Sequence, residues 1–212
     1  MTSGRPLRRD AAANRERLLA TAQEVFEQHG IDAGVDLIAA TAGVGVGTLY
    51  RHFPTKSALY DAVSLQMVEA VVAVVEQTQE VEPGRQLEHY VRAVAELQPS
   101  YGRLVSRLWT TELALELRQR VGAAVHEFVV AGQRAGTVRP DLVDEDIPLV
   151  IWSLAGVRAY APGIGKAWRR MLDLACDGLR PAGATPLSAP PLDADELESL
   201  AERRPKLPAA KD

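Results

Sequence analysis

The chain has 212 residues, a formal net charge of −4 and 47% hydrophobic residues, which is enough for one large domain or two small ones. It has no run of about 18 apolar residues and no apolar segment behind its basic N-terminus, which argues against a transmembrane helix and a secretory signal. Its single cysteine, Cys176, cannot form an internal disulfide, so we expect a cytoplasmic protein with no membrane partner.

Charge is unevenly distributed along the chain. Residues 1–60 carry seven Lys/Arg and six Asp/Glu, whereas residues 61–212 carry 17 and 22. Arg5, Arg8 and Arg9 precede the first acidic residue, and we expect residues 1–9 to form a flexible basic arm that contacts DNA. Three arginines near a terminus are also typical of a solvated tail. A local basic module beside an acidic body nevertheless favours nucleic-acid binding by the N-terminal part.

Helix signals follow in chain order. Asp10 is a suitable N-cap for a first helix, whose apolar residues recur at helical spacing up to Phe26 and which Gly30 ends. Two short helices are predicted next, at about 35–42 and 46–52. Their lengths and the glycine-containing turn between them indicate a compact helical module.

A long helix is predicted to follow this module. Pro54 prevents the second short helix from continuing, and Thr55 caps a helix from Lys56 to about Thr78. Further helices are predicted at about 86–97, 101–109, 112–135, from Asp144 or Asp146 to 160, and 164–179. No segment shows the sustained alternation typical of a strand, so we expect an all-α fold.

Residues 181–212 differ from the rest in composition. They hold six of the 13 prolines and little that could build a core. We expect this tail to be disordered, except for a short helix from Leu192 to Arg204 in which Asp193 and Glu196 are spaced as a capping pair.

The most informative spacing is that of Ala39, Gly43 and Leu49. A small residue lets two helix axes cross closely, and a glycine four residues later allows a turn with positive φ. Leu49 then lies on the inner face of the second helix. These offsets fit a helix-turn-helix, whose second helix enters the major groove of DNA, so residues 46–52 are predicted to form a recognition helix.

Residues 15–60 resemble the N-terminal domain of the tetracycline-repressor (TetR) family. The resemblance is carried by the run Gly47-Thr48-Leu49-Tyr50-Arg51-His52-Phe53, by Lys56-Ser57-Ala58-Leu59 after it, and by these earlier positions: Arg17, Leu18, Leu19, Ala22, Phe26, Gly30, Ile38, Ala39, Ala42, Gly43 and Val44. It implies a three-helix helix-turn-helix DNA-binding domain at 10–55 and a C-terminal helical ligand-binding and dimerisation domain at 56–180. Beyond residue 60 the chain matches the family only in the number, lengths and order of its helices.

The resemblance also implies roles for individual positions. Thr48 and His52 would contact phosphates from the recognition helix, and Lys56 would contact a phosphate from the positive end of the next helix. Tyr50 would present its phenol to the backbone or to a base edge. Arg51 would hold a guanine in a bidentate fork.

The start of the recognition helix departs from the family pattern. Val46 and Gly47 complete its exposed half, where Val46 could touch a thymine methyl. Gly34 and Gly45 stand where the family usually has Ser or Thr, and glycine caps a helix slightly less well than serine. We therefore expect the recognition helix to be loosely held until DNA binds.

The helices between residues 56 and 160 would, by the same resemblance, enclose a small-molecule pocket. Candidate apolar and aromatic lining residues are Met67, Tyr101, Leu104, Leu108, Trp109, Leu113, Phe128 and Trp152. Each of these is also compatible with a plain core position. Arg103, Arg107 and His126 would be polar contacts if they are buried, because a buried cation needs a partner.

The last two predicted helices of the second domain are candidates for a dimer interface. Their apolar and small residues would be hard to cover in a monomer. The interface candidates are Ile151, Ala155, Gly156, Trp168, Met171, Leu172 and Ala175. The alternative is that both helices belong to an internal core.

The favoured function is a repressor that binds a palindromic operator in double-stranded DNA as a homodimer and is released by a small hydrophobic or aromatic effector. One alternative is a DNA-binding regulator or activator without an effector. An enzyme is disfavoured, because we find no Ser/His/Asp set, no metal-ligand cluster and no glycine-rich phosphate loop behind a strand. Glu112 and Glu116 are more typical of a solvated helix face than of paired catalytic carboxylates. We expect no catalytic residue, metal site or cofactor.

Overall fold

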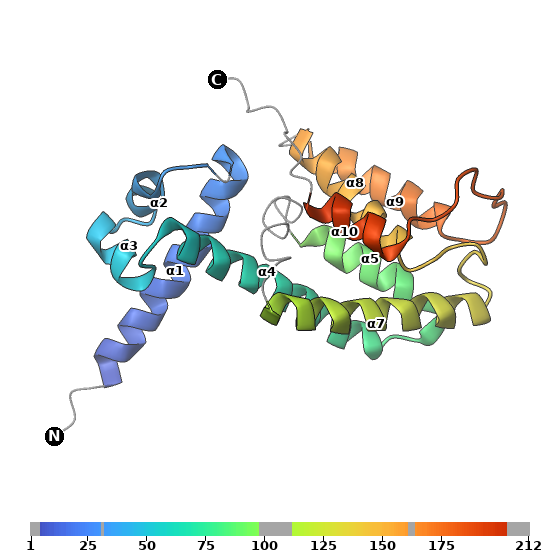
Figure 1. Cartoon of the computed structure of the whole chain (residues 1–212), viewed down its shortest axis with the longest axis horizontal. Helices are drawn as coiled ribbons and strands as arrows, with labels where there is room; N and C mark the ends of the chain where they lie inside the picture. Colours follow the sequence, from blue (N-terminus) through green and yellow to red (C-terminus); the bar gives the residue numbers. More distant parts are fainter. Residues whose placement is uncertain (1–4, 31, 98–111, 161–163, 203–212) are drawn as a thin grey trace. The chain divides into compact units, whose positions relative to one another are not determined.

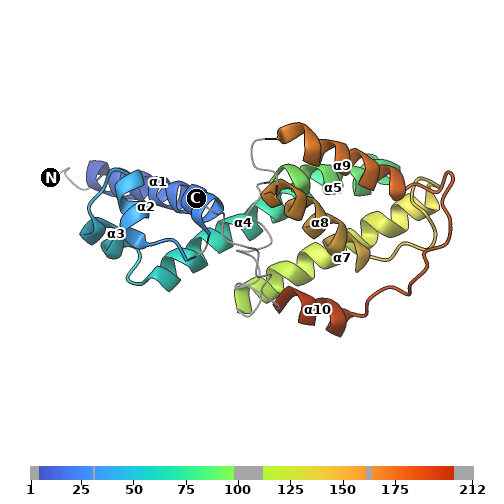
Figure 2. The same cartoon turned by 90° about the horizontal axis from the view of Figure 1, so that it is seen from above.

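The computed structural model describes residues 5–30, 32–97, 112–160 and 164–202 (Figures 1 and 2). The described residues contain helices and no strand, which confirms the predicted all-α class. They fall into two compact units, one ending at Gln66 and one starting at Met67. The boundary lies inside helix α4 (Lys56–Gln79), which supplies residues to both units.

The first unit contains α1 (Arg5–His29), α2 (Val35–Thr41), α3 (Val46–His52) and the start of α4. The bounds of α2, α3 and α4 agree with the predicted ones to within a residue. Helix α1, in contrast, begins five residues before Asp10, so residues 5–9 are helical and not the flexible arm that we expected. Pro6 stands in the first turn, where its missing N–H costs no hydrogen bond, and the alanines that follow favour helix.

Glycines end two of these elements as predicted. Gly30 follows α1 with φ of 83°, and its N–H donates to the Phe26 carbonyl at 3.0 Å. Gly43 has φ of 68° in the turn between α2 and α3, where the Val44 N–H donates back to the Ala39 carbonyl at 3.0 Å. A side chain at Gly43 would be strained in this left-handed backbone conformation, so the turn requires glycine.

The core of the first unit is small and fully covered. Leu49 of α3 and Phe53 after it are buried, and they join a cluster from the other helices: Leu18, Leu19, Phe26, Ile38 and Leu59. The Phe26 and Tyr60 rings pack with centroids 5.7 Å apart, and the Arg15 guanidinium lies 5.2 Å from the centroid of the Phe53 ring. Phe53 is therefore a core residue, and α3 is held on the unit by its inner face.

Helix α4 is long and apolar enough, by length and composition, to cross a membrane. Half of its most apolar window is buried inside the protein, however. Val63 contributes to the core of the first unit and Val71 to that of the second, so core packing accounts for the composition of α4.

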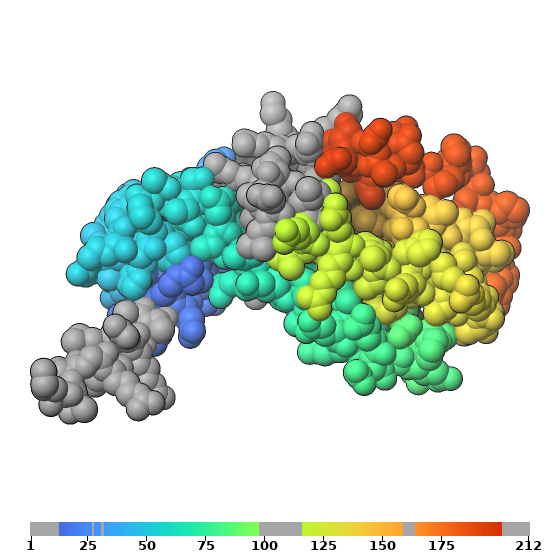
Figure 3. Space-filling model, turned by 60° about the horizontal axis from the view of Figure 1, so that its bottom comes forward, coloured from blue at the N-terminus to red at the C-terminus, as the bar shows by residue number. Residues whose placement is uncertain are grey.

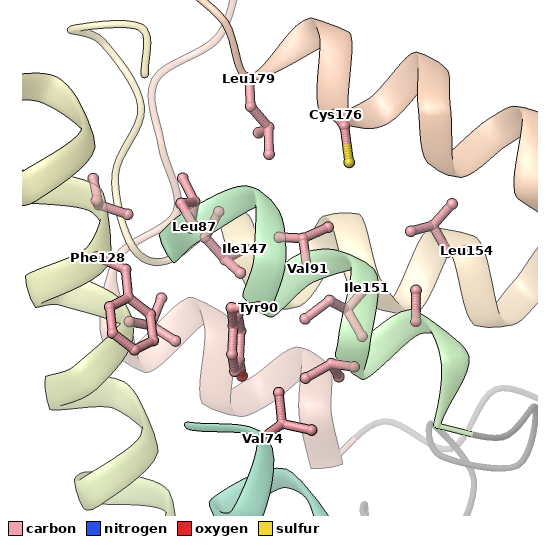
Figure 4. Close-up of a cluster of buried hydrophobic side chains, with 14 of the residues drawn as sticks. Val74, Leu87, Tyr90, Val91, Phe128, Ile147, Ile151, Leu154, Cys176 and Leu179 are labelled. Carbon is pink, nitrogen blue, oxygen red and sulfur yellow. The ribbon is translucent and has the colours of Figure 1, made fainter. Parts of the chain in front are cut away.

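The second unit contains a 3₁₀ turn η1 (Pro83–Arg85), α5 (Gln86–Glu96), α7 (Glu112–Arg134), α8 (Asp146–Tyr160), α9 (Gly165–Gly178) and α10 (Ala194–Glu202). Helix α5 packs against α7, α8 and α9 and is the central element. Figure 4 shows its Tyr90 beside Phe128 of α7, with ring centroids 5.9 Å apart. The predicted helix at 101–109 lies outside the described residues.

Ion pairs lock α5 to α9. Arg92 donates to Glu88 and to Asp173, each at 2.9 Å, and Arg180 donates to Glu88 at 3.0 Å. Burial opposes the charge of Glu88, but the two arginines outweigh that effect and lower its pKa. Cys176 is buried beside this network, and burial raises the pKa of its thiol to about 11. This thiol stays protonated near neutral pH.

The tail differs from the expected disorder over its first part. The Arg139 guanidinium donates to both carboxylate oxygens of Asp141 and to the Thr185 carbonyl, and the Leu187 N–H donates to Asp141. The reason is that Arg139 is buried and needs acceptors, which the tail backbone supplies.

Helix α10 follows this anchored segment. Its predicted capping pair is confirmed, since the Glu196 N–H donates to Asp193 at 2.8 Å and the Asp193 N–H donates to Glu196 at 3.0 Å. The reciprocal bonds satisfy two backbone donors that would otherwise lack partners at the start of the helix.

Candidate DNA interface and ligand cavity

Helix α3 has a buried side and an open side. Leu49 is fully buried, whereas Gly47, Tyr50 and Arg51 are exposed and Thr48 is half-buried. Positions 47, 50 and 51 are three and four residues apart, so they share one face of the helix. A side chain added at Gly47 would meet no atom of the described residues within 4 Å. Nothing in this part of the subunit therefore requires glycine there, and the open side of α3 is available to a partner.

One contact on α3 was not foreseen from the sequence. The Arg51 guanidinium donates to the Thr48 hydroxyl at 3.1 Å, one helical turn away. This bond holds a flexible side chain over the exposed face, which reduces the entropy lost when Arg51 binds a partner. The i, i+3 spacing is visible in the sequence, but nothing in the spacing alone chooses this pairing.

The start of α3 carries no side-chain cap. Gly45 is its N-cap, and the Thr48 and Leu49 N–H groups both donate to the Gly45 carbonyl, at 2.8 and 3.2 Å. The helix is thus formed, and whether it loosens without DNA stays a prediction. Gly34 likewise caps α2 without a side-chain hydrogen bond.

The start of α4 adds a second basic position. The Ala58 N–H donates to the Thr55 hydroxyl at 3.0 Å, which confirms Thr55 as the cap. Lys56 is the first residue of α4 and is half-buried. No acidic residue occurs between Leu37 and Tyr60, so the charge of Arg51 and Lys56 is not offset within this segment. Cations beside a helix N-terminus suit an anion such as phosphate.

The remaining residues predicted to contact DNA lie at the ends of α3 and in the first turns of α1. Val46 and His52 are half-buried at the two ends of α3. Arg5, Arg8 and Arg9 belong to the first turns of α1.

The second unit contains a cavity of about 330 Å³, within the size range of small-molecule sites. Helices α4, α5, α7, α8 and α10 contribute to its walls. The apolar lining includes Val68, Val71, Val94, Val121, Val125, Ile147, Ile151, Trp152 and Leu197. The polar lining is smaller and consists of Tyr90, Arg118, Asp144, Glu145 and Glu198.

Tyr90 is the deepest polar group of this lining. It is 4% exposed, and no hydrogen-bond partner for its hydroxyl is found in the part of the chain that the structure describes. Burial strongly raises the pKa of its phenol, so the hydroxyl keeps its proton and remains a donor. An unpaired buried hydroxyl costs about 1–3 kcal/mol, which a ligand carrying an acceptor would recover.

Of the described residues that were predicted to line the pocket, some line it and others do not. Trp152 lines the cavity, while Met67 and Phe128 are buried in the adjacent core and do not. His126 is exposed and lies 3.2 Å from Asp144, so the burial on which its predicted role as a polar contact depended is not found. The side chain of Leu113 lies outside the described residues, and so do the following predicted positions: Tyr101, Arg103, Leu104, Arg107, Leu108 and Trp109.

Sequence reasoning missed Tyr90, Arg118 and the contribution of α10. The sequence does contain a signal for Tyr90, because a residue with a hydroxyl lies among the buried apolar residues of the strongly amphipathic helix α5. Arg118 and Glu198 could not be paired from the sequence, because 80 residues separate them.

The residues predicted to form the dimer interface differ in how buried they are. Ile151, Trp168 and Leu172 are buried inside the single chain, so their prediction as interface residues is corrected. Trp168 is covered by its own subunit, with the Arg158 and Arg169 guanidiniums 4.3 and 4.9 Å from its ring centroid. The other candidates keep some exposure: Ala155, Gly156 and Ala175 are half-buried, and Met171 is 43% exposed.

Known protein families match segments of both units. Residues 18–63 match the model of "Bacterial regulatory proteins, tetR family", and residues 82–181 match that of "Transcriptional regulator SbtR-like, C-terminal domain". The crystal structure of a TetR transcription regulatory protein from Mycobacterium vanbaalenii is 33% identical, covering 82% of this chain and 99% of that one with a TM-score of 0.54. A TetR transcriptional regulator of Streptomyces coelicolor is 30% identical, covering 80% and 99% of the two chains with a TM-score of 0.58.

Curated relatives match over a short segment of the chain. An HTH-type transcriptional regulator of Staphylococcus aureus is 43% identical over 54 residues, which are 25% of this chain and 29% of the relative. The chain therefore spans less than a third of the length of these relatives.

Proposed function

The chain belongs to the TetR family of DNA-binding transcriptional regulators, and on that premise we propose that it is a repressor that binds a palindromic operator as a homodimer and is released by a small apolar effector. The observation that carries the effector part is the largely apolar cavity with a single unpaired buried phenol among its described lining. We place this activity in the cytoplasm, with double-stranded DNA as the partner.

We assign DNA recognition to the open side of α3 and the start of α4. Arg51 reads a guanine, and Tyr50, Val46 and Gly47 lie against the groove. Phosphate contacts come from these basic and hydroxyl groups: Thr48, His52, Lys56, Arg5, Arg8 and Arg9. The exposure of Tyr50 and Arg51 and the absence of acids from residues 37–60 support this assignment.

A second copy would bind the outer face of α8 and α9. Ile164, Met171 and Leu174 are 52%, 43% and 56% exposed, and they recur on one side of α9. Gly156 of α8 would let the partner helix approach closely. Two copies would present their recognition helices to successive major grooves about 34–36 Å apart, which is why the operator is a palindrome.

The effector would act through α4. This helix carries Lys56 at its start and the cavity-lining Val68 and Val71 further along. A molecule that occupies the cavity in one position of α4 better than in another shifts the population between them. The shift is limited by the difference in its affinity for the two states.

Selection of bound sequences from random DNA tests the DNA part, because a homodimer selects a two-fold symmetric site. A set of winners without a dyad would overturn the palindrome and the homodimer. Thermal-shift screening with small apolar compounds, followed by operator release measured by fluorescence anisotropy, tests the effector part. A regulator without an effector is the remaining alternative, and it is favoured if no compound both stabilises the protein and releases DNA.

A further inference from the structure

Helix α10 forms part of the wall of the cavity. Ala194, Leu197 and Glu198 line it, although α10 lies beyond residues 18–63 and 82–181 that match the two family models. Figure 3 shows α10, in red, on the outside of the second unit. The cavity is thus completed by a segment that the family domain does not include.

An ion pair fixes α10 to the opposite wall. The Arg118 guanidinium of α7 donates to the Glu198 carboxylate at 3.4 Å. The Arg118 side chain is 21% exposed and that of Glu198 is 51% exposed. Arg118 is therefore the more buried partner, and it is the one cation among the described residues that line the cavity.

The attachment of α10 is weak enough to be reversible. The connecting residues 181–191 are all exposed, Leu197 is only half-buried and Leu200 is 41% exposed. The hydrogen bond from Arg139 to the Thr185 carbonyl anchors the tail before α10, and within α10 the Glu198 carboxylate that pairs with Arg118 is half exposed. Segments with few buried apolar contacts open locally at low free-energy cost.

We propose that α10 is a built-in competitor of the effector, with Leu197 and Glu198 standing where an apolar body and a carboxylate of that molecule bind. This inference rests on the proposed function of the cavity as an effector site. The effector class is then an amphipathic carboxylic acid, which takes Arg118 from Glu198 and displaces α10 from the rim.

The place that Glu198 holds on Arg118 favours an acid over a neutral ligand. A carboxylate of the effector would occupy the position of the Glu198 carboxylate, 3.4 Å from the Arg118 guanidinium, whereas a neutral ligand would form no ion pair there. Glu145 and Asp144, which lies 3.2 Å from His126, also line the cavity.

The test uses the full chain and four probes: decanoate, naphthylacetate and the neutral amide of each, with affinities measured by isothermal titration calorimetry. Glu198→Gln should bind all four probes about three- to fivefold more tightly, the scale of a partly exposed ion pair, because every probe must displace α10. Asp195→Asn is the matched control, because it removes a carboxylate from the exposed surface of the same helix. Arg118→Gln should abolish the preference for acid over amide.

The apolar contact has its own pair of variants. Leu197→Ser should tighten binding of all four probes, whereas Leu200→Ser, at a solvent-facing position, should not. Equal effects of Glu198→Gln and Asp195→Asn would overturn the competitor. Amides that bind and release operator while acids gain nothing would leave the effector function standing and this inference refuted. Binding of no probe by any variant would overturn both.

Discussion

The sites that we propose for the two units differ in where they lie relative to the core of each unit. In the first unit most of the proposed DNA contacts lie outward on α3 and at the start of α4, within residues 46–56. In the second unit the proposed effector site lies inward, and its walls come from residues as far apart as Val68 and Glu198. An outward site can change without disturbing the core, whereas residues of an inward site contribute to stability and function together.

The two units should therefore respond differently to substitution. Tyr50 and Arg51 share α3 with the buried Leu49. Adjacent positions of this helix therefore differ in role, because Leu49 contributes to the core whereas Tyr50 and Arg51 face outward. Tyr90, in contrast, is at once a core aromatic packed on Phe128 and the deep donor of the cavity. Substitutions of comparable residues in the two units can therefore show whether stability and binding change separately, as expected for the first unit, or together, as expected for the second.

The largest expected effect is at Leu49. Leu49→Ala should lower the free energy of unfolding of the first unit by about 2–5 kcal/mol, because a fully buried leucine is lost, and DNA binding should fall with it. Tyr50→Ala should change stability by less than about 0.5 kcal/mol yet weaken DNA binding. Urea unfolding and operator anisotropy measure both. Comparable destabilisation by the two variants would contradict the division of α3 into inner and outer sides.

Arg51→Ala comes next. It should cost about 1–3 kcal/mol of discrimination between operator and random DNA, because a bidentate base contact is lost. Arg51→Lys should lose most of that discrimination as well, since lysine cannot form the fork. Arg134→Ala, an exposed cation at the end of α7, serves as the control. Equal losses on both DNAs would show that Arg51 contacts phosphate only.

In the second unit, Tyr90→Phe should raise the free energy of unfolding by about 1 kcal/mol, because it removes a buried hydroxyl without a partner among the described residues. The same variant should weaken effectors that carry a hydrogen-bond acceptor. Tyr50→Phe, at an exposed phenol, should leave stability unchanged. Thermal unfolding with and without compound provides the readout, and destabilisation by Tyr90→Phe would indicate that the hydroxyl is already satisfied.

The smallest effect concerns pH and the anchor of the tail. The hydrogen bonds from Arg139 lower the pKa of Asp141 to about 2, below its value of about 3.9 in an unfolded chain. Its contribution to stability is therefore complete above about pH 4 and is lost as the pH falls toward 2. The difference in melting temperature between the wild type and Asp141→Asn should shrink over this window. A difference that persists at pH 2 would contradict the role of the ion pair.

Much of the fold follows from local signals. Gly30, Gly43, Pro54 and Thr55 mark ends of helices through φ, a missing N–H or a capping hydroxyl, and the structure confirms their effects. The start of α1 was missed because Asp10 is a good cap in isolation, although the preceding residues extend the helix. Local chemistry therefore gives the ends of elements well where one residue dominates.

The same distinction between local and long-range contacts applies to the proposed sites. The helix-turn-helix was visible because its contacts span few residues, and its exposed face follows from helical periodicity. The inward site was not, because periodicity identifies an apolar stripe without saying what covers it. Ile151, Trp168 and Leu172 illustrate this, since the same stripe that suggested a partner subunit is buried by its own chain.

By itself, the sequence determined an all-helical fold class, the bounds of α2, α3 and α4 and a helix-turn-helix with Tyr50 and Arg51 outward, because capping, φ and periodicity act over a few residues. Only the tertiary structure decided that a cavity exists, that Tyr90 is left unpaired among its described neighbours, and that α10 reaches across to Arg118. Cavities and long-range pairs depend on how whole helices pack, and packing joins residues that no local rule connects.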